Sequence, residues 1–420
     1  MLRLLKWVVS LFSPYVNSFE RRVDKFFQSI KSTDGIAIIR DRLLQLMQRD
    51  LLVVNVWLEK KFKGYKYLSK KTRRKMYEDS KKIVKNFKDH KKLYTPNRND
   101  IEDFLNEKKL LYPSGDDEKI KYIFQIMSFL RPGKYYRYIK TASFGKLLRD
   151  PEKEKLEGDC NQIVTLYIYL YSLKFPVSDL KIKLLPEHVC LHFRGIDIEA
   201  TTAKVEKYVD CEQILPVTEI ISTNLLDLTD FREDVQKISE RVMVKSSQLA
   251  YAISSLKSLV TKNLHIAYTN LAVSSAKSKN FDSAIFFAEK ANDRKLLNSI
   301  YKNAAIYYMD KYNFSKAHFY AQKSNAYEIM KSIKRNEAVY YFNKNKIDKA
   351  LRVFTEINDK KMIKACYSKK YNELAVKTKN VKTVKQAKRH ISKYKKMLQY
   401  AKKMDDDRLV RELRDILAKI

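Results

Sequence analysis

Apolar residues at helical spacing dominate this chain and predict helices over most of its length. Residues 18–58 contain two blocks in which apolar side chains recur every three or four positions, which predicts two amphipathic helices. Shorter helices are expected around 101–111 and 116–130. Residues 217–420 contain neither glycine nor proline, which β-rich domains use at their turns. This half is therefore predicted to be entirely helical.

One stretch in the middle of the chain has a different pattern. A helical segment at 160–173 is followed by three short runs of alternating or β-branched residues, at 181–185, 188–193 and 196–200. Arg194-Gly195, between the last two runs, is typical of a two-residue hairpin turn. A helix followed by antiparallel strands predicts a small α+β core.

The glycine-free half contains an internal repeat of 33 residues. Alanines recur at this period in two series, one for each helix of a predicted pair: Ala272, Ala305 and Ala338, then Ala284, Ala317 and Ala350. Small residues there let two antiparallel helices approach closely. The units, over about 264–365, resemble tetratricopeptide repeats. They lack the consensus Trp, Gly and Pro, so another helical-pair solenoid or unrelated amphipathic helices remain alternatives.

These patterns predict a mostly helical chain in three regions. A basic amphipathic helical region at 1–100 precedes an α+β domain at 101–216, and an all-α repeat domain follows at 217–420. With 45% hydrophobic residues in 420, the chain can bury a core, which excludes global disorder. Runs of about 18 apolar residues are absent, as are glycine-rich phosphate loops. Polytopic membrane proteins and P-loop nucleotide hydrolases are therefore excluded.

The net charge of +36 comes from 85 Lys and Arg against 49 Asp and Glu. Most cations are scattered lysines, which favours a solvated basic surface over a ligand site. Residues 59–93 concentrate fifteen cations against four acids, with aromatic residues between them. Such a segment could bind RNA or single-stranded DNA by phosphate contact and base stacking, and the lysines of 382–403 could add to it. Alternatively, the apolar residues of 59–93 form the buried side of a helix.

Two further features concern location. Residues 1–12 carry two cations and a short apolar stretch, which suits either a membrane-surface helix or an ordinary docking helix better than a secretory signal. The four cysteines form no CxxC pair, so a reducing compartment is expected. They are Cys160, Cys190, Cys211 and Cys366. We predict a cytoplasmic protein, with peripheral membrane association as an option.

The first candidate for chemistry is Cys160. Asp159 is a natural N-cap for the helix at 160–173, and Gln162 stands where a capping-box partner belongs. Cys160 would then lie in the first helical turn, where free amides and the helix dipole favour a thiolate. The same amides could bind an oxyanion. A nucleophile of this kind also needs a base and an orienting acid.

Both partners occur in the predicted hairpin. Strand alternation puts His188, Cys190 and His192 on one face. The Arg194-Gly195 turn then pairs His192 with Asp197 and places Glu199 diagonal to His188, close enough to orient an imidazole. A solvent-facing strand would show a similar pattern.

A metal site is an alternative interpretation of the same histidines and cysteines. His188, Cys190 and His192 could bind one metal, with Cys160 or Cys211 as a fourth ligand. Structural zinc usually uses CxxC or histidine pairs on turns or helices instead. We therefore predict neither a metal nor an organic cofactor.

These motifs, in this order, resemble the transglutaminase-like (papain-like cysteine) superfamily over about residues 120–205. The matching segments are Gly158-Asp159-Cys160, His188-Val189-Cys190-Leu191 and Glu199-Ala200-Thr201. The resemblance implies that Cys160 is the nucleophile, His188 the general base and acid, and Glu199 the acid that orients His188. His192 and Asp197 are the alternative base and acid. The third motif departs from the family pattern, with Glu for Asp and Ala for Pro, and Cys190 replaces a usual aromatic residue.

The resemblance implies a cysteine-dependent acyl-transfer enzyme that acts on an amide through a thioester. The outcome could be peptide hydrolysis or amide transfer. The helical repeats would bind a protein partner or protein substrate. One alternative is a non-enzymatic interaction scaffold with a degenerate catalytic domain. A second alternative is a basic nucleic-acid-binding protein.

Overall fold

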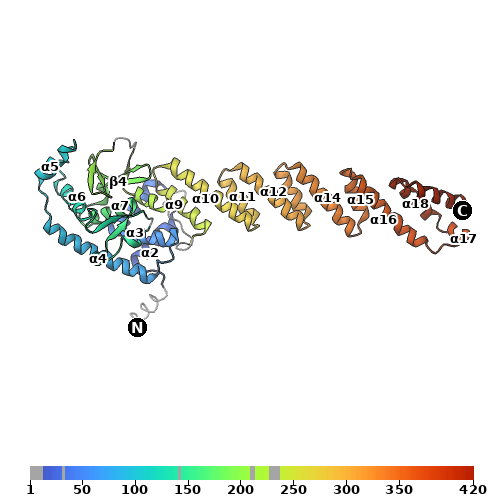
Figure 1. The fold of residues 1–420 in the computed structure, drawn as a ribbon, viewed down its shortest axis with the longest axis horizontal. Coiled ribbons are helices and arrows are strands. Elements are labelled where there is room, and N and C mark those ends of the chain that lie inside the picture. The colour runs from blue at the N-terminus through green and yellow to red at the C-terminus, as the bar shows by residue number, and fades with distance from the viewer. Residues whose placement is uncertain (1–12, 31–33, 141–142, 209–212, 227–236) are drawn as a thin grey trace, which may run out of the picture. The chain divides into compact units, whose positions relative to one another are not determined.

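The chain forms two compact units of mostly helical structure (Figure 1). The computed structural model describes residues 13–30, 34–140, 143–208, 213–226 and 237–420. The first unit covers Met1–Leu271 and the second covers Ala272–Ile420. Residues 1–12, for which a membrane-surface helix was an option, and Cys211 lie outside the described residues. Among the residues that are described, no helix has both the length and the apolar character needed to cross a bilayer.

The division between the units differs from the three predicted regions. The regions 1–100 and 101–216 share one hydrophobic core, so they are not separate bodies. The helices between residue 217 and Leu271 belong to the first unit, because Leu249, Ala250 and Ile253 are buried in that same core. The second unit begins within the helix Lys257–Lys277, 55 residues after the predicted boundary at 216/217.

Helix α3 (Ile36–Leu58) is the centre of the first unit. Its residues 51–58 are buried on every side, because α2, α4, α7, α8 and α9 all pack against it. A helix enclosed in this way loses the amphipathic periodicity of a surface helix. The surrounding helices are α2 (Ser18–Ser29), α4 (Lys70–Leu93), α5 (Arg98–Glu107), α6 (Asp117–Phe129), α7 (Cys160–Ser172), α8 (Glu219–Leu226), α9 (Glu240–Ile253) and α10 (Lys257–Lys277).

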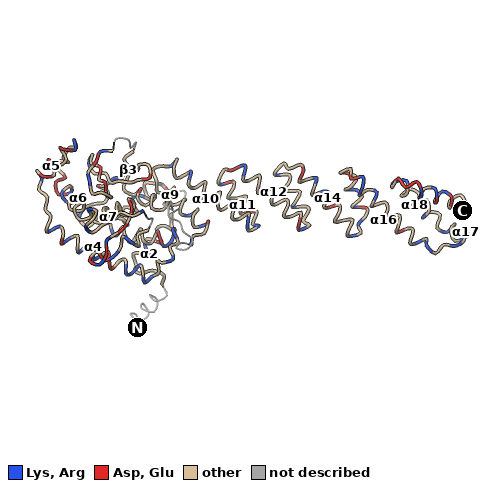
Figure 2. The backbone as a smooth tube through the Cα atoms, in the orientation of Figure 1, with Lys and Arg blue, Asp and Glu red and all other residues tan. Residues whose placement is uncertain are grey.

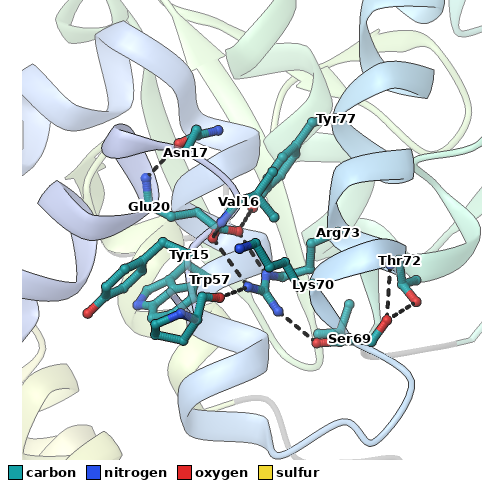
Figure 3. Close-up of polar contacts among 12 residues, drawn as sticks. Tyr15, Val16, Asn17, Glu20, Trp57, Ser69, Lys70, Thr72, Arg73 and Tyr77 are labelled. Carbon is teal, nitrogen blue, oxygen red and sulfur yellow. Dashed lines mark hydrogen bonds and ion pairs between the residues drawn. The ribbon is translucent and has the colours of Figure 1, made fainter. Parts of the chain in front are cut away.

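A buried ion pair connects α2 to α4 (Figure 3). Glu20 and Arg73 are 0% and 1% exposed, and the Nε of Arg73 donates to Glu20 Oε1 over 2.8 Å. The Tyr77 hydroxyl donates to the same oxygen over 2.6 Å. Arg73 also donates from Nη2 to the Pro14 carbonyl oxygen over 2.6 Å, and its guanidinium lies 5.2 Å from the Trp57 ring centre. The Arg73 guanidinium on α4 therefore contacts α2, the chain segment before α2, and the end of α3.

Most of the aromatic residues in the basic segment 59–93 pack into the core of the first unit. Phe62, Tyr65, Tyr77 and Phe87 are all buried, so their rings are not available to stack on bases. Tyr67 alone among its five aromatic residues is more than a third exposed. Lys and Arg occur along the whole length of both units (Figure 2). The aromatic part of the predicted nucleic-acid surface is therefore structural.

A five-stranded antiparallel sheet completes the first unit, with strand order β6-β5-β4-β3-β7. Arg194 and Gly195 both have positive φ, 48° and 88°, as the predicted two-residue turn requires. The register pairs His192 with Asp197, as that turn predicts. The strands are β3 (Lys181–Leu185), β4 (His188–Phe193), β5 (Ile196–Glu199), β6 (Lys204–Glu206) and β7 (Ile214–Pro216). The apolar face of β4 and β5 lies in the core.

The second unit is a series of antiparallel helix pairs, in which successive helices lie side by side (Figure 1). Its buried residues form three small clusters instead of one core, as in repeat proteins. The six alanines of the 33-residue repeat are all fully buried. The helices are α11 (Phe281–Lys290), α12 (Arg294–Asp310), α13 (Phe314–Lys323), α14 (Tyr327–Asn343), α15 (Ile347–Glu356), α16 (Lys360–Thr378), α17 (Val384–Lys388), α18 (Ile391–Met404) and α19 (Asp407–Ala418).

The turns of the repeat use residues other than glycine in the left-handed conformation. Each turn contains one left-handed residue, and these residues recur at the same period of 33. They are Lys279, Tyr312 and Asn345 in one turn of each pair, and Asn292, Asn325 and Asn358 in the other, with φ between 49° and 62°. Asparagine tolerates this conformation better than other residues with side chains. The helices therefore end without glycine.

The capping residue before the longer helix gives a test of the repeat. Asp293 and Asp359 accept hydrogen bonds from the third amide of their helices, whereas Ala326 holds the same backbone position without an acceptor. We expect Ala326→Asp to raise the free energy of unfolding by about 1 kcal/mol, measured by urea unfolding. Asp293→Ala is the matched control and should lower it by a similar amount. No change in either variant would contradict the capping argument.

Candidate active site

Cys160 begins helix α7, and a capping box fixes its position. The Asp159 carboxylate accepts from the Asn161 amide over 2.9 Å, and Gln162 Oε1 accepts from the Asp159 amide over 3.0 Å. A Cβ on Gly158 would lie 3.1 Å from the Cβ of Gln162, a tight contact, so glycine there favours the close approach of the strand β2 (Leu156–Gly158) to the first turn. Cys160 itself is buried, at 8% exposure. The Gly-Asp-Cys-Asn-Gln order therefore places the thiol at the helix N-terminus.

The cap also determines which helix amides could bind an oxyanion. The Asp159 carboxylate already accepts from the amides of Asn161 and Gln162. The Cys160 amide is the first of the helix, so it has no acceptor within the helix by position and is not part of the cap. Of the amides that the sequence suggested, that of Cys160 is therefore the best candidate donor to an oxyanion.

The structure brings Cys160, His188 and Glu199 together. His188 is the first residue of β4, and its Nε2 lies 2.6 Å from Glu199 Oε2 at the end of β5. The nearby Cys160 side chain, followed by the hydrogen bond to Glu199, raises the pKa of His188 from 6.5 to about 10, although burial opposes the shift. The His188 side chain is 26% exposed, so solvent and small reagents can reach it. These are the three residues that the sequence singled out.

Glu199 is held as a carboxylate by several donors. Its Oε1 accepts from the Thr201 amide over 3.1 Å and from the Thr201 hydroxyl, and its Oε2 accepts from the Tyr208 hydroxyl over 2.9 Å. Burial acts to raise the pKa of Glu199, but the hydrogen bonds from His188 and Thr201 outweigh it and the pKa lies below its ordinary value. Glu199 can therefore accept from His188 and hold the ring in one orientation.

The alternative pair, His192 and Asp197, has a different environment. His192 Nδ1 lies 2.6 Å from Asp197 Oδ1, and the Gly195 amide donates to His192 Nε2 over 3.3 Å. Asp197 also accepts from Lys183 Nζ over 2.7 Å and from the Tyr208 amide over 2.8 Å. Both ring nitrogens of this 8% exposed histidine are thus engaged within the hairpin. The pair stabilises the turn and has no ring nitrogen left for a nucleophile.

The geometry does not assemble the rival metal site. His188 and His192 bind different carboxylates, and Cys190 between them is fully buried. In the part of the chain that the structure describes, no three His, Cys, Asp or Glu side chains are grouped as metal ligands. Cys211, the other proposed ligand, lies outside that part.

Sequence reasoning missed three tyrosines around the site. Tyr136 and Tyr138 belong to the short strand β1 (Tyr136–Tyr138), which pairs in parallel with β2. The Tyr136 hydroxyl donates to the Gly158 carbonyl over 2.8 Å, and Tyr138 opposite Gly158 is 51% exposed. Burial, and then the nearby Cys160, raises the pKa of Tyr138. A three-residue strand has no recognisable periodicity, and nothing in the spacing of Tyr208 connects it with Glu199.

Comparison with known proteins identified no relative of this chain. No protein-family model, no curated protein and no solved structure matches the chain. The function is therefore inferred from the side chains of this site and from their chemistry.

The raised pKa of His188 predicts a specific pH dependence. Because this pKa exceeds the ordinary 6.5, protonation of His188 stabilises the fold fully below pH 6.5, and the contribution is lost as the pH rises through about 10. In a histidine NMR titration we expect His188 to titrate near pH 10. Cys160→Ala should bring its pKa down toward 6.5, and Glu199→Gln should do so by less, following the order of the causes. Cys366→Ser is the matched control and should leave the pKa of His188 unchanged. An ordinary pKa of His188 in the unmodified chain would contradict its proposed contacts with Cys160 and Glu199.

Proposed function

We propose that this protein is a cysteine-dependent acyl-transfer enzyme that acts on an amide through a thioester on Cys160. The observations that carry the proposal are the 2.6 Å hydrogen bond between His188 and Glu199 and the position of Cys160 close enough to His188 to raise the pKa of its imidazole. A nucleophile at a helix N-terminus, a base in contact with it, and a carboxylate that orients the base are the requirements for this chemistry. The His192–Asp197 pair meets none of these roles because it is closed within the hairpin.

The proposed reaction needs only these groups and a second substrate. The Cys160 thiolate attacks the amide carbonyl, and the Cys160 amide donates to the oxyanion that forms. Protonated His188 gives its proton to the leaving amine, the C–N bond breaks, and a thioester remains on Cys160. Water or an amine then attacks the thioester while His188 accepts its proton. The products are a carboxylic acid or a new amide, and free Cys160.

We further propose that the helix α7 with strands β3, β4 and β5 is a transglutaminase-like core. The support is the order Cys, His, carboxylate along one helix and two paired strands. Thr201, two residues after the acid, donates a hydrogen bond to Glu199 and helps to fix a side chain longer than the family's aspartate. The substitution at this position is therefore compatible with the same role.

The second unit would bind the protein substrate or partner. Phe286 and Phe319 occupy the same place in successive repeats, 33 residues apart, and are 52% and 51% exposed. Repeat proteins use such recurring positions as extended binding surfaces. In this proposal the first unit supplies the chemistry and the repeats supply selectivity.

Alkylation of Cys160 tests the nucleophile and its base. Iodoacetamide labelling followed by mass spectrometry of the peptides should modify Cys160 much faster than Cys190 and Cys366, which are fully buried. We expect His188→Ala to slow the labelling of Cys160 about tenfold or more, because the thiolate loses its cation. His318→Ala, in the second unit, is the matched control and should have no effect. Equal, slow labelling of all cysteines would contradict the proposal.

A simple acyl donor tests the thioester itself. p-Nitrophenyl acetate should give a burst of p-nitrophenol and an acetyl group on Cys160, which hydroxylamine removes. Cys160→Ser and His188→Ala should abolish the burst, and Glu199→Gln should lower its rate about tenfold to a hundredfold through a less well oriented base. A scaffold with a degenerate site would show no burst above that of Cys160→Ser.

A further inference from the structure

A cavity in the first unit has no part in the proposed acyl chemistry. It is a hollow between α2 and α3 that is open to solvent, has a volume of about 590 Å³, and shares no residue with the Cys160 site. Four of the side chains that line it are cations: Arg21, Arg22, Lys25 and Arg42. None of the described residues that line it is acidic. A volume of this size is typical of small-molecule sites.

The cations reach the cavity because α2 separates its charges. Glu20 and Asp24 face the core, where Glu20 accepts from Arg73 and Tyr77 (Figure 3), and Asp24 accepts from Tyr15 and Trp57. The helical spacing of residues 21, 22 and 25 puts their side chains on the opposite face. The two acids of α2 are thus fixed by buried partners and cannot turn to neutralise the cavity.

Arg42 enters the same space from α3 and is partly fixed there. Its guanidinium lies 5.3 Å from the ring centre of Phe26, a buried residue of α2, and its Nη2 lies 3.4 Å from Ser29 Oγ. The neighbouring acid Asp41 accepts a hydrogen bond from Gln45 instead. In the described part of the chain, no ion pair involves any of the four cations of the cavity.

Like charges that share a cavity repel one another, and a bound anion removes this repulsion. Three arginines present planar sets of donors that match phosphate oxygens two at a time, and Lys25 adds a compact positive charge. A single carboxylate would leave most of this charge unpaired. A ligand with several phosphate groups would pair all four cations.

We propose that the cavity between α2 and α3 binds a small polyphosphorylated group, either as a soluble metabolite or as a phosphoinositide headgroup. The two sources share one chemistry, clustered phosphates on a compact scaffold. The inference does not depend on the acyl-transfer proposal, because the two sites use different residues.

Titration calorimetry on the full chain tests the site, with inositol hexakisphosphate as the soluble probe. Sedimentation with phosphatidylcholine vesicles, with and without phosphatidylinositol bisphosphate, tests the lipid source. We expect Arg22→Gln combined with Arg42→Gln to raise the Kd about tenfold or more. Arg74→Gln combined with Lys81→Gln is the matched control, because it removes the same charge from residues that are exposed, as Arg22 and Arg42 are, but lie outside the cavity. Its Kd should change by less than about twofold.

Each outcome either supports the proposed phosphate site or overturns it. Binding of the soluble probe that the cavity variant weakens supports the site, and binding only to phosphoinositide vesicles, weakened by the same variant, supports it with a lipid source. Lys25→Gln offers a second variant if Arg42→Gln unfolds the chain in a thermal denaturation. Equal weakening by the cavity and control variants would show general electrostatic attraction and overturn the proposal, as would no binding to either probe.

Discussion

The fold of the first unit depends on two charges that have no access to water. Removing one partner from such a pair typically costs about 3–5 kcal/mol, because the other is left buried and unpaired. Burying the two charges also carries a desolvation cost, which Glu20 and Arg73 offset through additional bonds, to Tyr77 and to the carbonyls of Pro14 and Leu68. The geometry that satisfies them fixes α2 against α4, and the stacking of Arg73 on Trp57 fixes both against α3. Since α3 packs on α7, this interaction indirectly positions the helix that carries Cys160.

The hairpin uses the same histidine–carboxylate pairing twice, with different consequences. At His192 the second ring nitrogen accepts from the Gly195 amide, two residues before Asp197, so the pair is complete and stabilises the turn. At His188 the ring is hydrogen-bonded to Glu199, and the Cys160 side chain, which belongs to a different element, lies close enough to raise its pKa. What distinguishes a candidate base from a structural histidine is therefore where its second partner comes from. Strand alternation alone could not make that distinction.

The sequence predicted those parts of the site that follow from local rules. The capping box around Cys160 and the Arg194-Gly195 turn each depend on a few neighbouring residues, and the turn then determines that Glu199 lies near His188. Tyr136, Tyr138 and Tyr208 were missed because their approach depends on packing between distant segments. The division into two compact units differs from the predicted regions for a similar reason. An amphipathic helix such as α9 has the same pattern whether it covers a globular core or begins a repeat.

The net charge of +36 understates how basic the surface is. Nine acidic residues are buried in the described part of the chain, against three basic ones, Lys63, Arg73 and Lys183. Several of the buried acids serve structural or chemical roles, as Glu20, Asp159 and Glu199 do, whereas Asp79 and Asp150 pair with exposed lysines. Clusters of unpaired cations therefore arise from how the helices pack as well as from composition. In α2 the packing turns every acid inward, and a scattered basic composition becomes a local concentration of positive charge.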